Sequence, residues 1–355
     1  MLELARRSVP TLHVIDGIVE WRNTWENPTH DAPGLPAMPL FRPILSHKVA
    51  CLGRSQARLL ESWGNRGKCE VVGLPRLDGM IEGPRRPRRD DGPFRILVAT
   101  ARTPGFTPDQ LGRAERSLLD VKAWFETNPS LEGRAVEPVW RVSGQLTSRL
   151  GLPRARHDAF GTDLPGVLEK VDAMVSTPST LLLEGMLAGI PVALLDYNNR
   201  PPYVPAAWSI TAPEHVGAAL GELLRPAANR MEHQEFLLHE ALECRTPAAP
   251  RLRKLISEMI RIGRECRREG KAPVFPERIL EASSGAPPSF ETAELYPQHE
   301  VLRQESARLQ AELGHLRRAT SWNLTSVRDR VVSRVFRALR RPTVVRARRD
   351  DPPSH

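Results

Sequence analysis

The sequence predicts an α/β protein with parallel sheets, arranged as two doubly wound domains followed by a helical tail. Residues 172–197 read as strand, polar turn, helix, glycine stop and second strand, and short apolar runs alternate with helical patterns from residue 9 to residue 268. Such alternation is typical of parallel sheets with right-handed crossovers. Residues 79–93 are rich in proline, glycine and arginine, which predicts a linker between the two domains.

The first 80 residues predict part of a Rossmann-like domain. Strands are expected at 9–15, 48–52 and 69–74, with a helix at 55–63 that ends at a glycine. A complete domain of this kind usually needs about 150 residues. We therefore expect residues 1–80 to form an incomplete N-terminal domain.

A turn at the end of the first strand carries two candidate catalytic residues, Asp16 and His13. Asp16 stands beside Gly17, and a carboxylate at the C-terminal end of a strand is placed to act as a general base for an acceptor hydroxyl. Each residue also has a structural interpretation. Asp-Gly pairs commonly form bends, and a strand histidine often packs against its neighbours.

Residues 94–270 predict a second Rossmann-like domain, which opens with the apolar strand 94–100. Further strands are expected at 135–142, 173–175, 192–195 and up to residue 210, and helices at 111–126, 164–170, 181–188, 215–224, 229–242 and 250–268. The last of these helices are expected to help cover the sheet. Residues 273–298 predict a second linker.

The helix expected at 181–188 begins at a turn that is rich in hydroxyl groups, Ser-Thr-Pro-Ser-Thr at 176–180. Unpaired backbone N–H groups and the positive end of the helix dipole suit a phosphate at such a position. Glu184 lies one turn beyond Thr180, so its carboxylate could accept hydrogen bonds from both hydroxyls of a ribose. In the alternative interpretation, the hydroxyls only cap the helix and Glu184 is a solvated acid.

Two further segments are expected at the same edge of the second sheet. The loop after strand 94–100 contributes Arg102 and Thr103 as candidates for phosphate binding, and the end of strand 135–142 contributes Arg141. Arg102 could equally be an ordinary surface arginine.

The hydroxyl turn, Glu184 and the following Met-Leu-Ala-Gly-Ile-Pro-Val-Ala-Leu-Leu-Asp-Tyr resemble the nucleotide-sugar site of GT-B glycosyltransferases, especially those that build bacterial surface polysaccharides. The resemblance covers about residues 11–256. It implies that Ser179 and Thr180 hold the donor diphosphate and that Glu184 holds the ribose. It also implies that Asp16 is the base, because related enzymes carry an acidic residue before glycine at this place.

The C-terminal residues 299–341 predict two helices. Leu302, Leu309 and Leu316 fit a short coiled coil that could form a homodimer, although few heptads support it. Residues 324–340 predict a basic amphipathic helix that could rest on an anionic membrane surface. The helix could also pack on its own protein. Nucleic acid is not expected as a partner, since no aromatic residues are interleaved with the basic ones.

Composition narrows the class of protein. The chain has 355 residues, 40% of them hydrophobic, and a net charge of +9 that is concentrated at 84–89 and 328–349. Four dispersed cysteines form neither a disulfide framework nor a metal motif, and residues 1–9 lack the apolar core of a signal peptide. We therefore expect a cytoplasmic protein, with the tail peripheral at the inner membrane face.

The expected function is transfer of a sugar from a nucleotide-sugar donor to a glycan or lipid-linked acceptor. No Asp-x-Asp pair occurs, which fits metal-independent chemistry without a cofactor, because the helix dipole and basic groups would stabilise the leaving diphosphate. A nucleotide-sugar epimerase or a polyol-phosphate transferase of the same fold is an alternative. A nonenzymatic remnant with a shortened N-terminal domain is another.

Overall fold

The computed structural model describes residues 9–28, 40–81, 92–152 and 164–281. The described residues all belong to one compact unit. The predicted tail at 299–341 and most of the linker predicted at 79–93 lie outside the described residues. No helix in the described ranges is both long and apolar enough to cross a membrane.

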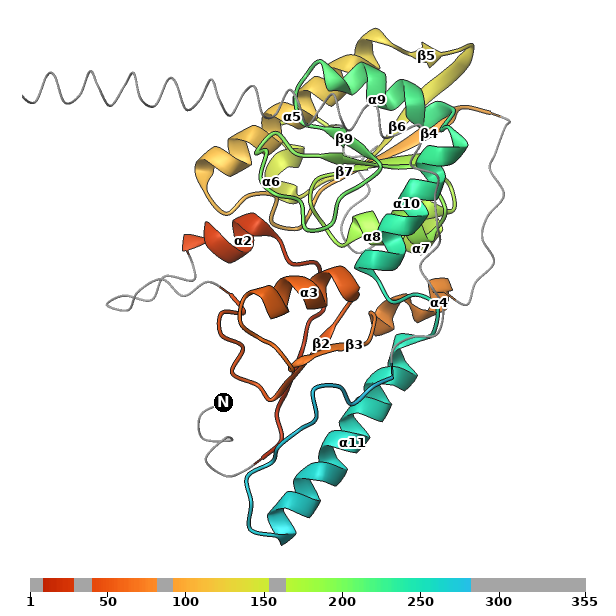
Figure 1. The fold of residues 1–355 in the computed structure, drawn as a ribbon. Helices are drawn as coiled ribbons and strands as arrows, with labels where there is room; N and C mark the ends of the chain where they lie inside the picture. The colour runs from red at the N-terminus through yellow and green to blue at the C-terminus, as the bar shows by residue number, and fades with distance from the viewer. Residues whose placement is uncertain (1–8, 29–39, 82–91, 153–163, 282–355) are drawn as a thin grey trace, which may run out of the picture. The chain divides into compact units, whose positions relative to one another are not determined.

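The N-terminal part contains a three-stranded parallel sheet in the order β1-β2-β3 (Figure 1). Its elements are β1 (Leu12–Val14), α2 (Trp21–Trp25), β2 (Lys48–Cys51), α3 (Arg54–Ser62), β3 (Cys69–Val71), η2 (Pro75–Leu77) and α4 (Asp78–Ile81). All three predicted strands are therefore present, each shorter than the apolar run that predicted it.

The second sheet has six strands in the order β5-β6-β4-β7-β8-β9, and all pairs except β5 with β6 are parallel. The strands are β4 (Phe94–Ala99), β5 (Ser130–Leu131), β6 (Arg134–Arg141), β7 (Ala173–Ser176), β8 (Val192–Leu195) and β9 (Trp208–Ile210). Strand β4 is the first of the parallel strands along the chain, and it lies between the second, β6, and the third, β7. This is a doubly wound order whose direction reverses between β4 and β7.

Alternating side chains place helices on both faces of the second sheet. Leu97 of β4 packs with α8 (Leu181–Leu187) and α10 (Ala228–Ala241), whereas its neighbours Ile96 and Val98 pack with α5 (Pro108–Thr127) and α9 (His215–Leu224). The strands are apolar on both faces because both faces are covered. The short helices α6 (Gly144–Thr147) and α7 (Leu164–Leu168) complete the domain. The predicted α/β class is confirmed.

We call the three-stranded sheet and its helices the small part, and the six-stranded sheet and its helices the large part. The last described helix, α11 (Ala248–Arg268), packs on the small sheet. Its buried Leu255 and Met259 pack with Ala50 of β2 and with Val72. The expectation that this helix covers the second sheet is wrong, because helical periodicity shows that a helix has an apolar face but does not show which sheet covers it.

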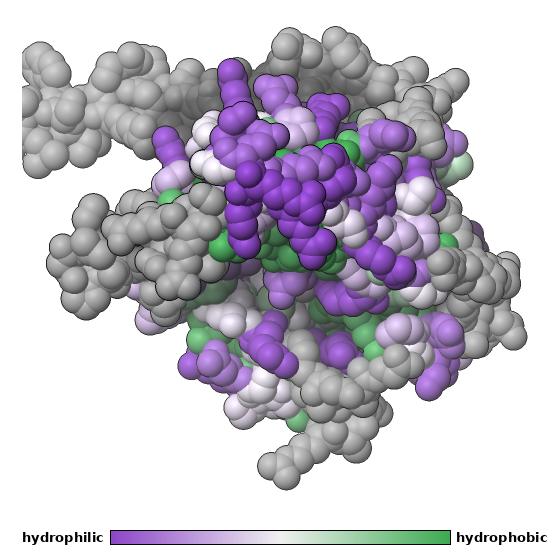
Figure 2. Space-filling model, turned by 90° about the horizontal axis from the view of Figure 1, so that it is seen from below, coloured by the Kyte–Doolittle hydropathy of each residue, from purple (hydrophilic) through white to green (hydrophobic). Residues whose placement is uncertain are grey.

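Hydrophilic side chains predominate on the face seen from below in Figure 2, with apolar ones between them as small patches.

The segment after α11 is packed on the small sheet, so the first part of the linker predicted at 273–298 is also wrong. Lys48 is fully buried, and its Nζ donates to Glu70 Oε1 at 2.8 Å and to the Glu277 carbonyl at 2.8 Å. The Glu70 carboxylate also accepts from the backbone N–H groups of Ile279 at 2.8 Å and Leu280 at 3.0 Å. A buried ion pair with its remaining hydrogen bonds satisfied in this way is costly to break.

The small and large sheets share one apolar core. Leu52 and Leu60 of the small part belong to the same buried cluster as Leu183 and Ile190 of the large part. The chain crosses between the parts after α10, where the Glu243 N–H donates to the Leu52 carbonyl at 2.7 Å. At this crossing, Gly53 lies directly against the backbone at the end of α10.

Replacing Gly53 with alanine should lower the free energy of unfolding by about 1–3 kcal/mol, the usual range for overpacking. The added methyl would lie 2.4 Å from the Ala241 carbonyl and 2.6 Å from Leu242 N, which are backbone atoms that cannot rotate away. Urea unfolding of the two proteins measures the difference.

Gly112→Ala is the matched control. This glycine is exposed in α5 with nothing within 4 Å of an added Cβ, so alanine should stabilise the protein by about 0.5–1 kcal/mol through helix propensity. A Gly53→Ala protein as stable as the wild type would show that α10 does not approach Gly53 this closely.

Candidate functional site

The loops that follow β4 and β7 meet where the strand order of the large sheet reverses. Thr177 holds them together: its N–H donates to the Ala99 carbonyl at 3.2 Å, and its hydroxyl accepts from the Ala101 N–H at 3.1 Å. The loop after β6 joins them through the Ser143 N–H, which donates to the Thr100 hydroxyl at 2.9 Å. In open parallel sheets, ligands bind at such a reversal of strand order.

The three residues predicted for these loops lie at this edge in different settings. Arg102 and Thr103 are exposed in the loop after β4, and Arg141 is buried at the end of β6. The exposed guanidinium of Arg102 is therefore open to a ligand. Arg141 lies next in the chain to Val142 and Ser143, which are also buried.

The hydroxyls predicted to hold phosphate have protein partners. Ser179 Oγ accepts from the Leu181 N–H at 3.2 Å, as a capping residue does. Thr180 Oγ1 accepts from the Ile18 N–H at 3.2 Å. A phosphate at this turn would have to share these hydroxyls or displace their present bonds.

The same contact brings the Asp16 turn to the start of α8. Asp16 is exposed and lies two residues before Ile18, so the predicted base and the hydroxyl turn adjoin one another. His13 is exposed on β1, and its ring contacts the ring of Phe41 edge-on at 5.6 Å. The structure thus shows Asp16, and not His13, beside the turn.

Glu184 is buried in α8 and forms an ion pair with Arg76 of η2, which lies in the small part. The side chain of Glu184 is 4% exposed and that of Arg76 is 49% exposed. Arg76 bonds to Oε1, and no hydrogen bond is recorded for Oε2 within the described ranges. Sequence reasoning missed Arg76, although its place in the turn after a strand was a signal.

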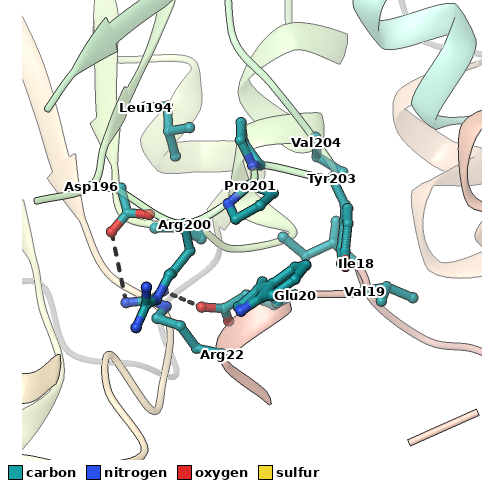
Figure 3. A pocket seen from close by; sticks show the side chains of 13 residues that line it. Ile18, Val19, Glu20, Arg22, Leu194, Asp196, Arg200, Pro201, Tyr203 and Val204 are labelled. Carbon is teal, nitrogen blue, oxygen red and sulfur yellow. Dashed lines mark ion pairs between the residues drawn. The ribbon is translucent and has the colours of Figure 1, made fainter. Parts of the chain in front are cut away.

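A small pocket beside this region is lined by charged and proline-rich segments (Figure 3). Arg22, 2% exposed, lies between Glu20 and Asp196, forming an ion pair with Glu20 and approaching Asp196 Oδ1 at 3.9 Å. Pro201 and Tyr203 lie on the opposite side. The free volume is about 20 Å³, enough for about one water molecule.

Glu20, which lines this pocket, has a pKa that is shifted mainly by its burial. Burial raises the pKa of the Glu20 carboxyl from 4.5 to about 7, against the opposing effect of Arg22, and the negative charge of Asp196 adds to the rise. A carboxyl that titrates near neutral pH has the property of a general acid or base.

Four aromatic side chains join the two parts at the edge of the pocket. Trp25 packs against Trp63 of the small part at 5.4 Å and donates from Nε1 to the Tyr203 hydroxyl at 3.2 Å. Trp21 lies 6.1 Å from the Tyr203 ring. The segment 21–25 is therefore a helix whose tryptophans are in contact with the loop before β9.

Among the described residues, no group of three or more His, Cys, Asp or Glu side chains is placed to hold a metal ion. Arg22, Arg76, Arg102 and Arg200 are the basic groups around the strand ends and the pocket. Arg22, Arg76 and Arg200 form ion pairs with acidic residues, and Arg102 is exposed.

Replacing Asp196 with asparagine should lower the pKa of Glu20, because it removes a neighbouring negative charge. The folded protein binds the Glu20 proton more tightly than the unfolded chain does. Protonation of Glu20 therefore stabilises the fold fully below about pH 4.5, and this stabilisation is lost as the pH rises through about 7. Titration of the side-chain carboxyl carbon by NMR measures the pKa. Asp109→Asn, at a side chain that is 73% exposed, is the control. An unchanged Glu20 midpoint in Asp196→Asn would disprove the coupling.

No family model and no curated protein matches this chain. Among solved structures, the chain is similar to S. aureus MnaA with UDP, with 14% identity, 73% of this chain and 70% of that chain covered, and a TM-score of 0.49. It is similar to the wall teichoic acid polymerase TagF, with 12% identity, coverage of 72% and 68%, and a TM-score of 0.46. It is also similar to the calicheamicin glycosyltransferase, with 15% identity, coverage of 73% and 70%, and a TM-score of 0.44. These are likenesses of fold, at identities too low to carry a residue's role from one protein to another.

Proposed function

We propose that this chain is a glycosyltransferase of the GT-B type that binds a nucleotide sugar at the β4–β7 edge and transfers the sugar without a metal ion. The observation that supports the proposal best is the position of Glu184. Its buried carboxylate lies one turn into α8, beyond the hydroxyl turn at the reversal of strand order. Arg76 holds one carboxylate oxygen and so fixes the other.

In this proposal, the second oxygen of Glu184 accepts hydrogen bonds from the ribose hydroxyls. A carboxylate has about four lone-pair positions, and Arg76 occupies one of them. Because the side chain is almost fully buried, a hydrogen bond to it would be stronger than the same bond in water. Arg76 also places a positive charge beside this carboxylate.

The diphosphate would lie over the turn 177–180, with Arg102 as its exposed cationic partner. A phosphate oxygen would accept a hydrogen bond from the Thr180 hydroxyl, whose oxygen can still accept from the Ile18 N–H. A guanidinium offers several donors in a planar fork, which suits a leaving diphosphate. The basic groups would then do what a divalent ion does in other transferases.

On the acceptor side, Asp16 is the proposed base. It is exposed in the turn that contacts Thr180, so an acceptor hydroxyl could reach both Asp16 and the donor sugar. We propose a surface glycan or a lipid-linked glycan as the acceptor. The roles proposed for the tail, membrane attachment and dimer formation, concern residues outside the described ranges.

Replacing Glu184 with glutamine should weaken the binding of a nucleoside diphosphate by about 1–3 kcal/mol, or about 5- to 150-fold. Glutamine keeps the size and one acceptor but removes the charge, and Arg76 is exposed enough to be solvated, so folding should be retained. Calorimetric titration with UDP, CDP and GDP measures the affinity.

The control is Glu137→Gln, at a side chain of β6 that is 53% exposed. It should bind as the wild type does. Equal affinity of the Glu184→Gln and wild-type proteins for every diphosphate that binds would remove the proposed ribose site. Formation of an epimerised nucleotide sugar without acceptor, in place of acceptor-dependent release of the diphosphate, would favour the epimerase.

A further inference from the structure

A second cavity lies in the small part, between α3, β3, the start of α11 and residues 278–281. Its volume is about 260 Å³, and none of its lining residues belongs to the proposed nucleotide site. Small-molecule sites usually enclose about 300–1,000 Å³. The cavity lies just below this range, which limits its ligand to about the size of one sugar ring with one further group.

Four arginines from three segments line this cavity, which we call the arginine cavity: Arg54, Arg58, Arg251 and Arg278. Arg251 is held in place because its Nε and Nη2 donate to the Val71 carbonyl at 3.3 and 2.6 Å. Arg278 is exposed, and the described residues provide it with no recorded hydrogen bond or ion pair. Its full set of donors is available to a ligand.

The two arginines of α3 share a single carboxylate. Arg54 Nε lies 3.3 Å from Glu240 Oε1, and Arg58 bonds to Oε2 of the same group. Two positive charges therefore meet one negative charge. Glu70 also lines the cavity, but it is buried and paired with Lys48. With Glu61 and Glu281 counted as well, four guanidiniums face three carboxylates, so one positive charge is unmatched and suits a phosphate.

The remaining lining residues suit the sugar. Within the described ranges, the side-chain carboxylates of Glu61 and Glu281 form no hydrogen bond or ion pair. An ionised carboxylate can only accept, so each could accept from a hydroxyl group. Ala57 and Leu280 supply an apolar wall. Hydroxyl groups and a phosphate on one small molecule would satisfy both kinds of polar group.

We propose that the arginine cavity binds a phosphorylated sugar. The guanidinium groups, with Arg278 as the available one, bind the phosphate, and Glu61 and Glu281 bind the hydroxyls. The site is separate from the proposed nucleotide site and does not depend on that proposal.

Calorimetric titration of the full chain with glucose 6-phosphate tests the proposal. The wild type should bind one equivalent, and glucose and inorganic phosphate should each bind at least about tenfold more weakly, because each satisfies only one set of groups. Arg278→Gln should reduce the affinity for glucose 6-phosphate by about tenfold or more. Arg278 is exposed, so this variant should fold normally.

Two controls separate this site from general charge and from the nucleotide site. Arg253→Gln changes an exposed arginine of α11 that does not line the cavity, and it should bind glucose 6-phosphate as the wild type does. Glu184→Gln should also leave this affinity unchanged. The proposal is overturned if no saturable binding occurs, if Arg253→Gln and Arg278→Gln weaken it equally, or if Glu184→Gln weakens it.

Discussion

The crossing of the chain from α10 to α11 is the constraint on which the arrangement of the candidate site depends. At this crossing, the backbone of Ala241 and Leu242 lies on Gly53, and the Glu243 carbonyl would lie 2.7 Å from a Cβ at Gly73, whose φ is +96°. The Asp78 carboxylate accepts from the first N–H groups of α11, Ala248 at 2.7 Å and Ala249 at 2.8 Å. These bonds hold α4 to the start of α11, directly after the crossing.

The consequence for the site is that groups from both parts meet at the start of α8. Arg76 of η2 reaches Glu184, and the backbone of Ile18 reaches Thr180. In each contact, a residue of the small part touches a residue of the large part that lies close to the end of a strand. A ligand that binds there contacts the same groups that join the two parts, so its affinity and the joining of the two parts are linked.

The secondary structure could be predicted from the sequence because most elements have a clear period and clear ends. Helix 215–224 and strand 192–195 were predicted with the observed bounds, since an apolar helix face marks the first and an apolar run marks the second. The partner of each element could not be predicted. Nothing in the residues near Glu184 indicates Arg76, more than a hundred positions earlier, and the pairing of Lys48 with Glu70 depends on strand register. Of the predicted site residues, Thr180 and Glu184 could be placed near the β4–β7 edge because they follow a parallel strand of that sheet. Asp16 follows β1 of the other sheet, and its place beside Thr180 depends on how the two parts pack.

Hydrogen exchange measured by mass spectrometry, with and without UDP or another bound nucleoside diphosphate, tests the central claim most directly. The account predicts slower exchange in peptides that cover residues 177–187, because a ligand there stabilises the turn and α8. It also predicts a changed exchange rate in residues 16–22 and 72–78, because Ile18 contacts Thr180 and Arg76 contacts Glu184. Binding of a nucleoside diphosphate that leaves exchange in residues 177–187 unaltered would contradict it.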